Sequence, residues 1–242
     1  MKLLPTPAMS TLRAATRLRI LAALLLIGAS AGVLAADYVD LRRIEPLRGD
    51  AAAGAAKAAV CTACHGPGGN ALVPAFPNLA GQRADYLYQR LIEFKTADPK
   101  SPYYAASPMP TQVAGLSEAD LRNLAAYFAA QAPGASVAAA GDDRGESLYL
   151  SGDPERGIPP CQGCHGADAR GPAPADGRYA AYPRLRGQHA PYLVARLNNF
   201  RGNLPQHSSN DFIMHGVART LDDSSIQAIA AWLASLPPQP AH

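Results

Sequence analysis

The stretch Cys61-Thr62-Ala63-Cys64-His65 returns as Cys161-Gln162-Gly163-Cys164-His165, and these two pentapeptides hold all four cysteines of the 242-residue chain. In each copy two thiols stand three residues apart, and a histidine follows the second thiol directly. On one helical turn this spacing lets both thiols add to the two vinyl groups of a single haem, while the next residue presents its imidazole to the iron. The sequence therefore predicts two covalently bound haem c groups, with iron ligands at His65 and His165 and attachment at Cys61, Cys64, Cys161 and Cys164.

Three other uses of four cysteines explain the pattern less completely. Disulfides, in any of three connectivities, leave the histidine after each pair without a role. A zinc site that shares all four thiolates would join two halves that lie 100 residues apart in the chain. A thioredoxin-like redox pair belongs in a βαβ unit, and the sequence shows no such pattern.

The similarity between the two halves extends beyond the pentapeptides. Phe76-Pro77-Asn78-Leu79-Ala80-Gly81-Gln82 matches Tyr182-Pro183-Arg184-Leu185-Arg186-Gly187-Gln188, and Ala125-Ala126-Tyr127 matches Ala230-Ala231-Trp232. Order and spacing are kept over a period well above the roughly 20 to 50 residues of solenoid repeats, which indicates an internal duplication. The two copies, which carry Cys61 and Cys161, are called repeat 1 and repeat 2 below. The expected boundaries are 36–131 for an N-terminal domain with haem 1, 132–141 for an Ala/Gly/Pro linker and 142–242 for a C-terminal domain with haem 2.

Apolar periodicity in both repeats predicts helices. The residues at i, i+4 and i+7 are Leu87, Leu91 and Phe94 in repeat 1 and Leu193, Leu197 and Phe200 in repeat 2. Ser117 and Asp120 are placed as a capping box for the last helix of repeat 1, and Asp222-Asp223 begins its counterpart. Each repeat is expected to run helix, haem motif, Pro/Gly-rich loop, helix, loop with Met, helix. Because no long stretch alternates with period two, the predicted fold class is all-α.

Each iron also needs a sixth ligand, and the methionines supply one candidate per repeat. Met1 and Met9 lie in the N-terminal leader, which leaves Met109 and Met214 at the same point of the two repeats. His/Met ligation raises the reduction potential of a haem and suits electron transfer. His215, next to Met214, is the rival ligand and would make the second haem bis-histidine. The remaining histidines, expected to be solvated or bonded locally, are His189, His207 and His242.

Other repeated residues are candidates for support around the haem. A carbonyl at Pro77 or Pro183 can accept the Nδ1–H of the proximal histidine and fix its tautomer. The simpler interpretation of each Pro-x-Leu-x-Gly segment is a turn. Four further side chains are candidates to reach haem propionates or else to lie in the core or on the surface: Tyr86, Tyr192, Gln82 and Gln188.

The N-terminus has the layout of an export signal. Four basic residues between Lys2 and Arg19 precede an apolar run from Ile20 to Ile27, and small residues follow up to Ala35. We expect residues 1–35 to be a signal peptide cleaved after Ala35, which places the folded part in a bacterial periplasm. The alternative is a retained anchor that associates the protein with the membrane through its N-terminus, because Ile20 to Ala36 carries no charge and approaches the length of a membrane span.

Charge and composition narrow the class of protein further. The net charge of +3 comes from the four basic leader residues, since the rest of the chain has 22 − 4 = 18 basic and 19 acidic residues. No basic surface for nucleic acid is expected. Only 36 of the 207 residues after Ala35 are Leu, Ile, Val or Phe, a share that suggests disorder only when the net charge is high. In this nearly neutral chain we expect two haems to supply the missing apolar bulk.

These residues resemble the cytochrome c4 family, periplasmic electron carriers made of two class I cytochrome c domains in tandem. The resemblance covers residues 46 to 236 and is carried by both Cys-x-x-Cys-His motifs, both Pro-x-Leu-x-Gly-Gln segments and both methionine positions. It implies two class I cytochrome c domains related by duplication, with haems that meet near the domain interface. The residue pairs that it implies are His65 with Met109, His165 with Met214, His65 with the Pro77 carbonyl and His165 with the Pro183 carbonyl.

The expected function is transport of single electrons in a respiratory chain, from a quinol-oxidising complex to a terminal oxidase, without enzymatic activity. Both repeats supply a sixth ligand, whereas a catalytic haem generally keeps an open position. The alternatives are the haem subunit of a periplasmic dehydrogenase, a di-haem peroxidase and an anchored subunit of an oxidase complex. The choice of partner stays open because the stretch Asp37 to Leu47 and the arginines of repeat 2 depart from the family pattern, and charge shapes docking. Those arginines are Arg170, Arg178, Arg184 and Arg186.

Overall fold

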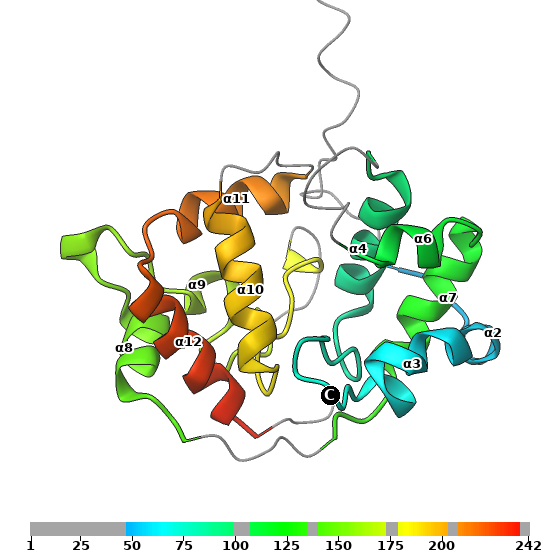
Figure 1. Cartoon of the computed structure of the whole chain (residues 1–242), viewed down its shortest axis with the longest axis horizontal. Helices are drawn as coiled ribbons and strands as arrows, with labels where there is room; N and C mark the ends of the chain where they lie inside the picture. The colour runs from blue at the N-terminus through cyan, green and yellow to red at the C-terminus, as the bar shows by residue number, and fades with distance from the viewer. Residues whose placement is uncertain (1–46, 99–106, 135–139, 173–178, 203–207, 238–242) are drawn as a thin grey trace, which may run out of the picture. The chain divides into compact units, whose positions relative to one another are not determined.

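The computed structural model describes residues 47–98, 107–134, 140–172, 179–202 and 208–237 (Figure 1). Within these ranges the chain is helical and has no β-strand, only an isolated bridge between Asp153 and Ile158. The all-α prediction is therefore confirmed. None of the helices in the described ranges has the length and hydropathy that a membrane crossing requires. The predicted signal peptide, His207, His242 and Arg178 lie outside the described residues.

In repeat 1 the longest helices are α4 and α7, and the haem motif forms a short turn between α2 and α4. The elements in chain order are α2 (Ala51–Lys57), η1 (Ala58–Cys61), α3 (Thr62–His65), η2 (Pro67–Gly69), α4 (Ala84–Thr96), α6 (Met109–Val113) and α7 (Glu118–Ala129). Helix α7 packs against both α2 and α4, and α6 packs against α4 (Figure 1). The predicted capping box is present, because the Ser117 hydroxyl accepts from the Asp120 N–H and the Asp120 carboxylate accepts from the Ser117 N–H.

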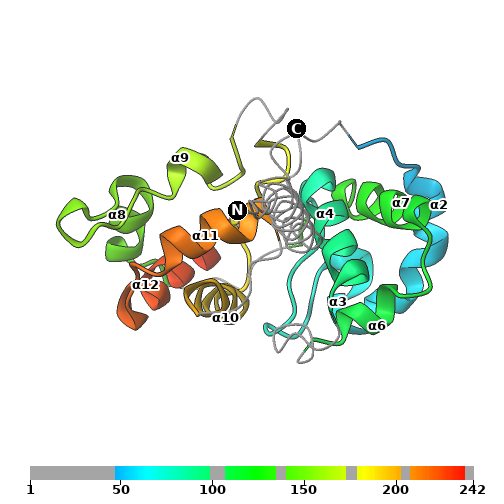
Figure 2. The ribbon, with the colours of Figure 1, turned by 90° about the horizontal axis from the view of Figure 1, so that it is seen from above.

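Repeat 2 follows the same order with a longer segment around its methionine. Its elements are α8 (Asp143–Ser151), η3 (Pro154–Arg156), α9 (Gln162–His165), α10 (Ala190–Arg201), α11 (Ser209–Ala218) and α12 (Asp223–Ser235). Helix α12 packs against α8 and α10, and α11 packs against α10, as Figure 2 shows from above. The carboxylate of Asp222 accepts from the Ser225 N–H at 2.7 Å and caps α12, as its position in the sequence predicts.

A glycine lets the first helix of each repeat cross the last helix closely. A Cβ atom at Gly54 in α2 would lie 2.1 Å from the Asn123 carbonyl oxygen of α7, and one at Gly145 in α8 would lie 2.0 Å from the Ala228 carbonyl oxygen of α12. The two backbones therefore approach each other within a distance that only glycine permits.

The loop predicted around each methionine is wrong in both repeats, because both methionines lie in helices. Met214 lies inside α11, whose first turn is capped by the Ser208 hydroxyl accepting from the Asp211 N–H at 3.2 Å. Phe212, Ile213 and Gly216 are weak helix formers, so packing against α10 stabilises this helix more than intrinsic propensity does. In repeat 1, Met109 is the first residue of the short helix α6.

Candidate haem sites

The two cysteine motifs form matching single turns of helix. Cys61 precedes α3 and Cys161 precedes α9, and both are half-buried, whereas Cys64 and Cys164 are exposed. None of the four thiols is in a disulfide. Gly66 and Gly166 end the turns at φ 71° and 77°, in the left-handed region that favours glycine. A Cβ at Gly66 would also lie 1.9 Å from the Asn70 carbonyl oxygen, so the turn is closed tightly after the histidine.

The histidine of each motif is buried and held by one hydrogen bond. His65 and His165 are each 7% exposed. Nδ1 of His65 lies 3.0 Å from the Pro77 carbonyl oxygen, and Nδ1 of His165 lies 3.1 Å from that of Pro183. Since a carbonyl only accepts, each Nδ1 carries the proton and each Nε2 is the nitrogen with a lone pair for a metal. The structure thus forms both of the contacts that the sequence predicts for Pro77 and Pro183.

The protonation of these histidines also suits metal binding. Burial lowers the pKa of both imidazoles, partly opposed by the hydrogen bonds to the two proline carbonyls. Burial disfavours the charged form, so the neutral imidazole predominates near neutral pH. Neutral imidazole is the form that ligates iron.

The two candidate methionines lie on corresponding elements. Met109 begins α6, which packs on α4, and Met214 lies in α11, which packs on α10; both side chains are half-buried. The rival His215 uses its Nδ1 in a 2.8 Å hydrogen bond with the Phe200 carbonyl oxygen at the end of α10. His215 therefore has a hydrogen-bond partner within repeat 2. Met214, and not His215, is the residue that corresponds to Met109 of repeat 1.

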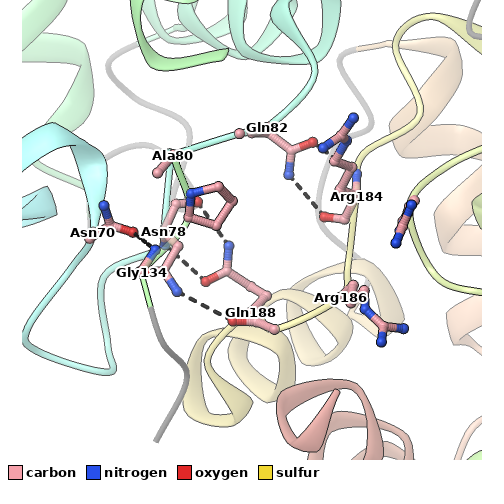
Figure 3. Close-up of a pocket in the computed structure, with 12 residues that line it drawn as sticks. Asn70, Asn78, Ala80, Gln82, Gly134, Arg184, Arg186 and Gln188 are labelled. Atoms are coloured by element: carbon pink, nitrogen blue, oxygen red, sulfur yellow. Dashed lines mark hydrogen bonds between the residues drawn. The ribbon is translucent and has the colours of Figure 1, made fainter. Parts of the chain in front are cut away.

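Two of the side chains that are candidates for the haem propionates, Gln82 and Gln188, contact the other repeat. Gln82 bonds to the backbone of Arg184, and Gln188 bonds to the backbone of Asn78 (Figure 3). His189, expected to be solvated or bonded locally, also reaches across, with Nε2 3.1 Å from the Ala71 carbonyl oxygen. The sequence pattern could not predict these contacts because it shows that the glutamines repeat and not what faces them.

Buried arginine nitrogens between the repeats fit an acidic group that the protein chain does not supply. Within the described ranges, Nη1 of Arg83 and Nε of Arg184 are buried and have no hydrogen-bond partner. Leaving a buried charged donor unpaired is costly, so each site favours an anion. Haem carries two propionate carboxylates, and the donors on this chain therefore fit the group that the cysteine motifs predict. Arg83 is a residue that the sequence analysis missed, because its counterpart in repeat 2 is His189 and not an arginine.

An ion-pair network on α4 and α11 was also missed. Arg90 contacts both the carboxylate of Glu93, which is buried, and that of Asp211 in repeat 2, the latter at 3.6 Å. Burial raises the pKa of Glu93, and Arg90 opposes this effect. The repeat pattern hides Glu93, since the matching residue of α10 is Asn199.

No group of three or more His, Cys, Asp or Glu side chains within the described ranges is arranged to hold a metal ion by itself. The zinc alternative, which requires all four thiolates at one point, therefore receives no support from the fold. The structure instead keeps the two cysteine motifs on separate turns, each with its own buried histidine.

Comparison with known proteins agrees with this arrangement. The family model for cytochrome c matches twice, at residues 51–131 and 143–237. Cytochrome c4 of Thiocapsa roseopersicina is 42% identical over 195 residues, which cover 79% of this chain and 95% of the relative. The thiosulfate dehydrogenase electron acceptor of Stutzerimonas stutzeri (strain A1501) is 35% identical over 185 residues, which cover 74% of this chain and 80% of the relative. The crystal structure of reduced recombinant cytochrome c4 from Pseudomonas stutzeri is similar at a TM-score of 0.68 and 36% identity, covering 78% of this chain and all of that one.

Two helical repeats, each with an attachment motif and a buried histidine, define an electron-transfer protein made of two class I cytochrome c domains. Such a protein carries two covalently bound haem c groups, attached at Cys61 and Cys64 and at Cys161 and Cys164. Within this class, the chain belongs to the cytochrome c4 family. Its members transfer electrons and are not enzymes.

Proposed function

We propose that this protein works in the periplasm and passes single electrons from a quinol-oxidising complex to a terminal oxidase. The observation that carries the proposal is the matched set of groups in the two repeats. Each repeat supplies a buried neutral histidine, tied at Nδ1 to a proline carbonyl, and one methionine at the same point. Two six-coordinate irons have no position for a substrate, which favours a carrier over a catalyst.

The proposed axial ligands are His65 with Met109 for haem 1 and His165 with Met214 for haem 2. When bound, each haem c supplies one reversible Fe(III)/Fe(II) couple. The protein's own groups set the conditions for it: Nδ1 stays protonated against the proline carbonyl, so Nε2 keeps its lone pair and its orientation. A buried ligand that is already neutral needs no proton release when it binds or when an electron arrives.

The proposed domain limits are residues 36–131 and 142–242 with a linker at 132–141, and residues 1–35 as a cleaved signal peptide. Mass spectrometry of the protein from a periplasmic fraction tests the leader. A mass that begins at Ala36 or Asp37 and includes two haems supports cleavage, and a mass that includes Met1 contradicts it and favours a retained membrane anchor.

A second candidate donor follows from one of the relatives. A protein 35% identical to this chain is named a thiosulfate dehydrogenase electron acceptor. That similarity makes a periplasmic dehydrogenase of a sulfur compound the alternative source of electrons, with the same two-haem carrier as recipient.

The deciding experiment mixes the purified oxidised protein with each donor and records haem reduction in a stopped-flow spectrometer. Fast reduction by a quinol-oxidising complex, followed by oxidation by a terminal oxidase, supports the respiratory route. Fast reduction by thiosulfate dehydrogenase with thiosulfate, and slow reduction by the quinol-oxidising complex, replaces that donor with the second candidate. Carbon monoxide serves as the control for the carrier role, because rapid stoichiometric binding to one haem of the reduced protein would contradict two filled irons.

A further inference from the structure

The strongest unexplained feature is a reciprocal pair of glutamines between the repeats. The side-chain amide of Gln188 bonds to both backbone groups of Asn78: its Oε1 accepts from the Asn78 N–H at 2.9 Å, and its Nε2 donates to the Asn78 carbonyl at 3.0 Å. Gln82 does the same to Arg184, at 2.8 and 2.9 Å (Figure 3). We call these four hydrogen bonds the glutamine clasp.

Each glutamine side chain is also held by a hydrogen bond within its own repeat. Oε1 of Gln82 also accepts from the N–H of Arg83, and Oε1 of Gln188 accepts from that of His189. Both glutamines are only 7% exposed. Because each oxygen faces two N–H donors and each nitrogen faces a carbonyl, the orientation of both amides is determined by their partners.

The residues held by the clasp are the ones that follow the two prolines. The Pro77–Asn78 peptide group accepts the Nδ1–H of His65 at its oxygen and donates its own N–H to Gln188. The Pro183–Arg184 peptide group accepts from His165 and donates to Gln82. One peptide group therefore joins the proximal histidine of one repeat to a glutamine of the other, in both directions.

We propose that Gln188 and Gln82 are positioning residues: each sets how strongly Nε2 of the proximal histidine in the opposite repeat donates electrons to the iron. This inference rests on the ligation by His65 and His165 proposed above, and not on the identity of the donor or acceptor. Hydrogen bonds in a chain polarise one another, so a peptide N–H that donates to Gln188 makes its carbonyl oxygen a better acceptor. A better acceptor on Nδ1–H makes the imidazole a stronger electron donor at Nε2, which lowers the reduction potential of the iron it binds.

The arrangement also links the electron affinity of each haem to the docking of the two domains. If the domains separate, the glutamine clasp breaks. The carbonyls of Pro77 and Pro183, which accept from the two histidines, are then no longer polarised by the glutamines. A carrier whose domains are pressed together or pulled apart by a partner would thus change both potentials through these two side chains. The crossed connection gives the proposal a signature that an ordinary interface contact does not have.

The test replaces one glutamine at a time in the full-length protein with both haems attached. Gln188→Met keeps the length of the side chain and removes both hydrogen bonds to Asn78. We expect the potential of haem 1 to shift upward while that of haem 2 stays in place. Gln82→Met should raise the potential of haem 2 and leave haem 1 in place. The readout is a spectroelectrochemical titration in which haem methyl proton resonances assign each potential to its domain.

His189→Ala is the matched control, because it removes another contact between the repeats, the one to the Ala71 carbonyl, without touching either proline peptide. Both potentials should stay at their original values in this variant. Equal shifts at both haems, a shift at the haem of the substituted domain, or no shift in either glutamine variant would overturn the proposal. Either variant decides by itself if the other is not recovered with two haems.

The unaltered protein separates this inference from the ligation on which it rests. Its oxidised and reduced spectra report whether both irons have His/Met ligation. If they do and the crossed shifts are absent, only the clasp proposal fails. If the unaltered protein lacks His/Met ligation, the proposed axial ligands fail first.

Discussion

A single hydrogen bond at each proximal histidine decides which nitrogen is free for iron. The carbonyls of Pro77 and Pro183 can only accept, so the proton is fixed on Nδ1 of His65 and His165. Burial keeps both rings neutral by lowering their pKa. Each repeat thus offers iron one neutral imidazole whose Nε2 is free to bind. The sixth ligand then determines the reduction potential of each iron.

The methionine ligands give the first prediction. Met214→His should keep haem 2 covalently attached, because Cys161 and Cys164 are unchanged, and should lower its potential. Axial ligation spans a range of about 0.8 V among haem proteins, and we expect a shift of roughly a tenth of a volt or more. A redox titration with haem quantification measures both quantities.

Met109→His is the matched variant and should lower the potential of haem 1 alone. Unchanged potentials in the Met214 variant would show that Met214 does not bind iron and would return His215 to consideration. A drop in both potentials would instead indicate that the substitution had disturbed the whole molecule.

At the scale of the element, each domain depends on one close crossing between its first and last helices. The backbone of α8 lies so near α12 that a Cβ at Gly145 would be 2.0 Å from the Ala228 carbonyl oxygen and 2.9 Å from the Cβ of Trp232. One of these atoms belongs to the backbone and the other is a Cβ, so neither can move away by rotation of a side chain. Helix α2 crosses α7 at Gly54 in the same way.

Gly145→Ala should therefore destabilise the protein, although alanine favours helix more than glycine by about 1 kcal/mol. Forcing the two helices apart costs roughly 1 to 3 kcal/mol beyond that gain, as other overpacked substitutions do. Chemical denaturation of the two-haem protein measures the change in the free energy of unfolding. Gly115→Ala is the control, since its Cβ would meet nothing within 4 Å, and it should leave the stability nearly unchanged. An equal effect in both variants would refute the importance of the crossing.

The N-terminal cap of α12 gives a prediction about pH. Hydrogen bonds from Ser225, and then Ser224, hold the pKa of the Asp222 carboxyl well below its usual range. A carboxyl with a lowered pKa in the folded state adds stability above its unfolded pKa of about 3.9 and loses it as the pH falls further. Asp222→Ala should thus unfold at a lower temperature than the unaltered protein at pH 7, and this gap should narrow below about pH 4.

Thermal unfolding at pH 7 and at several values below pH 4 measures the gap. Asp222→Asn is the control, because asparagine caps helices as well as aspartate but does not ionise. Its unfolding temperature should lie nearer that of the unaltered protein at pH 7. A gap for Asp222→Ala that stays constant throughout the acid range would contradict the assignment of this pKa.

The sequence predicts local elements better than contacts between distant ones. The capping box at Ser117 and the apolar stripe from Leu87 to Phe94 follow from spacing within one repeat, and the family resemblance implies the histidine contact with Pro77. The helices at Met109 and Met214 are not predicted, because neither segment has a strong apolar period and α6 is only five residues long. The partners of Gln82 and Gln188 could not be predicted, since they depend on how two similar units meet.

For the whole molecule, the described parts of both repeats belong to one compact unit, yet their apolar cores are unequal. The buried cluster of repeat 1 consists of Ala58, Leu87, Leu124, Ala125 and Phe128. Repeat 2 adds Tyr149, which is fully buried and contacts Trp232 with ring centroids 4.8 Å apart and ring planes tilted by 40°. The Tyr149 hydroxyl donates to the Gly166 carbonyl at 2.7 Å. Repeat 1 has alanine and tyrosine, Ala58 and Tyr127, at the matching places. The cluster of buried apolar residues is therefore smaller in repeat 1 than in repeat 2.

Removal of the covalent haem should expose this difference. A haem supplies apolar surface that the small core of repeat 1 lacks, and a group that binds only the folded state contributes its binding free energy to stability. In Cys61→Ala/Cys64→Ala, repeat 1 should fail to fold stably and be degraded by a protease at low concentration.

In the matched variant Cys161→Ala/Cys164→Ala, the Tyr149 and Trp232 core should leave repeat 2 with more residual helix and slower cleavage. Limited proteolysis with mass spectrometry locates the cuts in each variant, and haem content is measured on the same samples. A compact, protease-resistant repeat 1 without haem would contradict the role assigned to the haem, and equal cleavage of the two repeats would contradict the comparison of their cores.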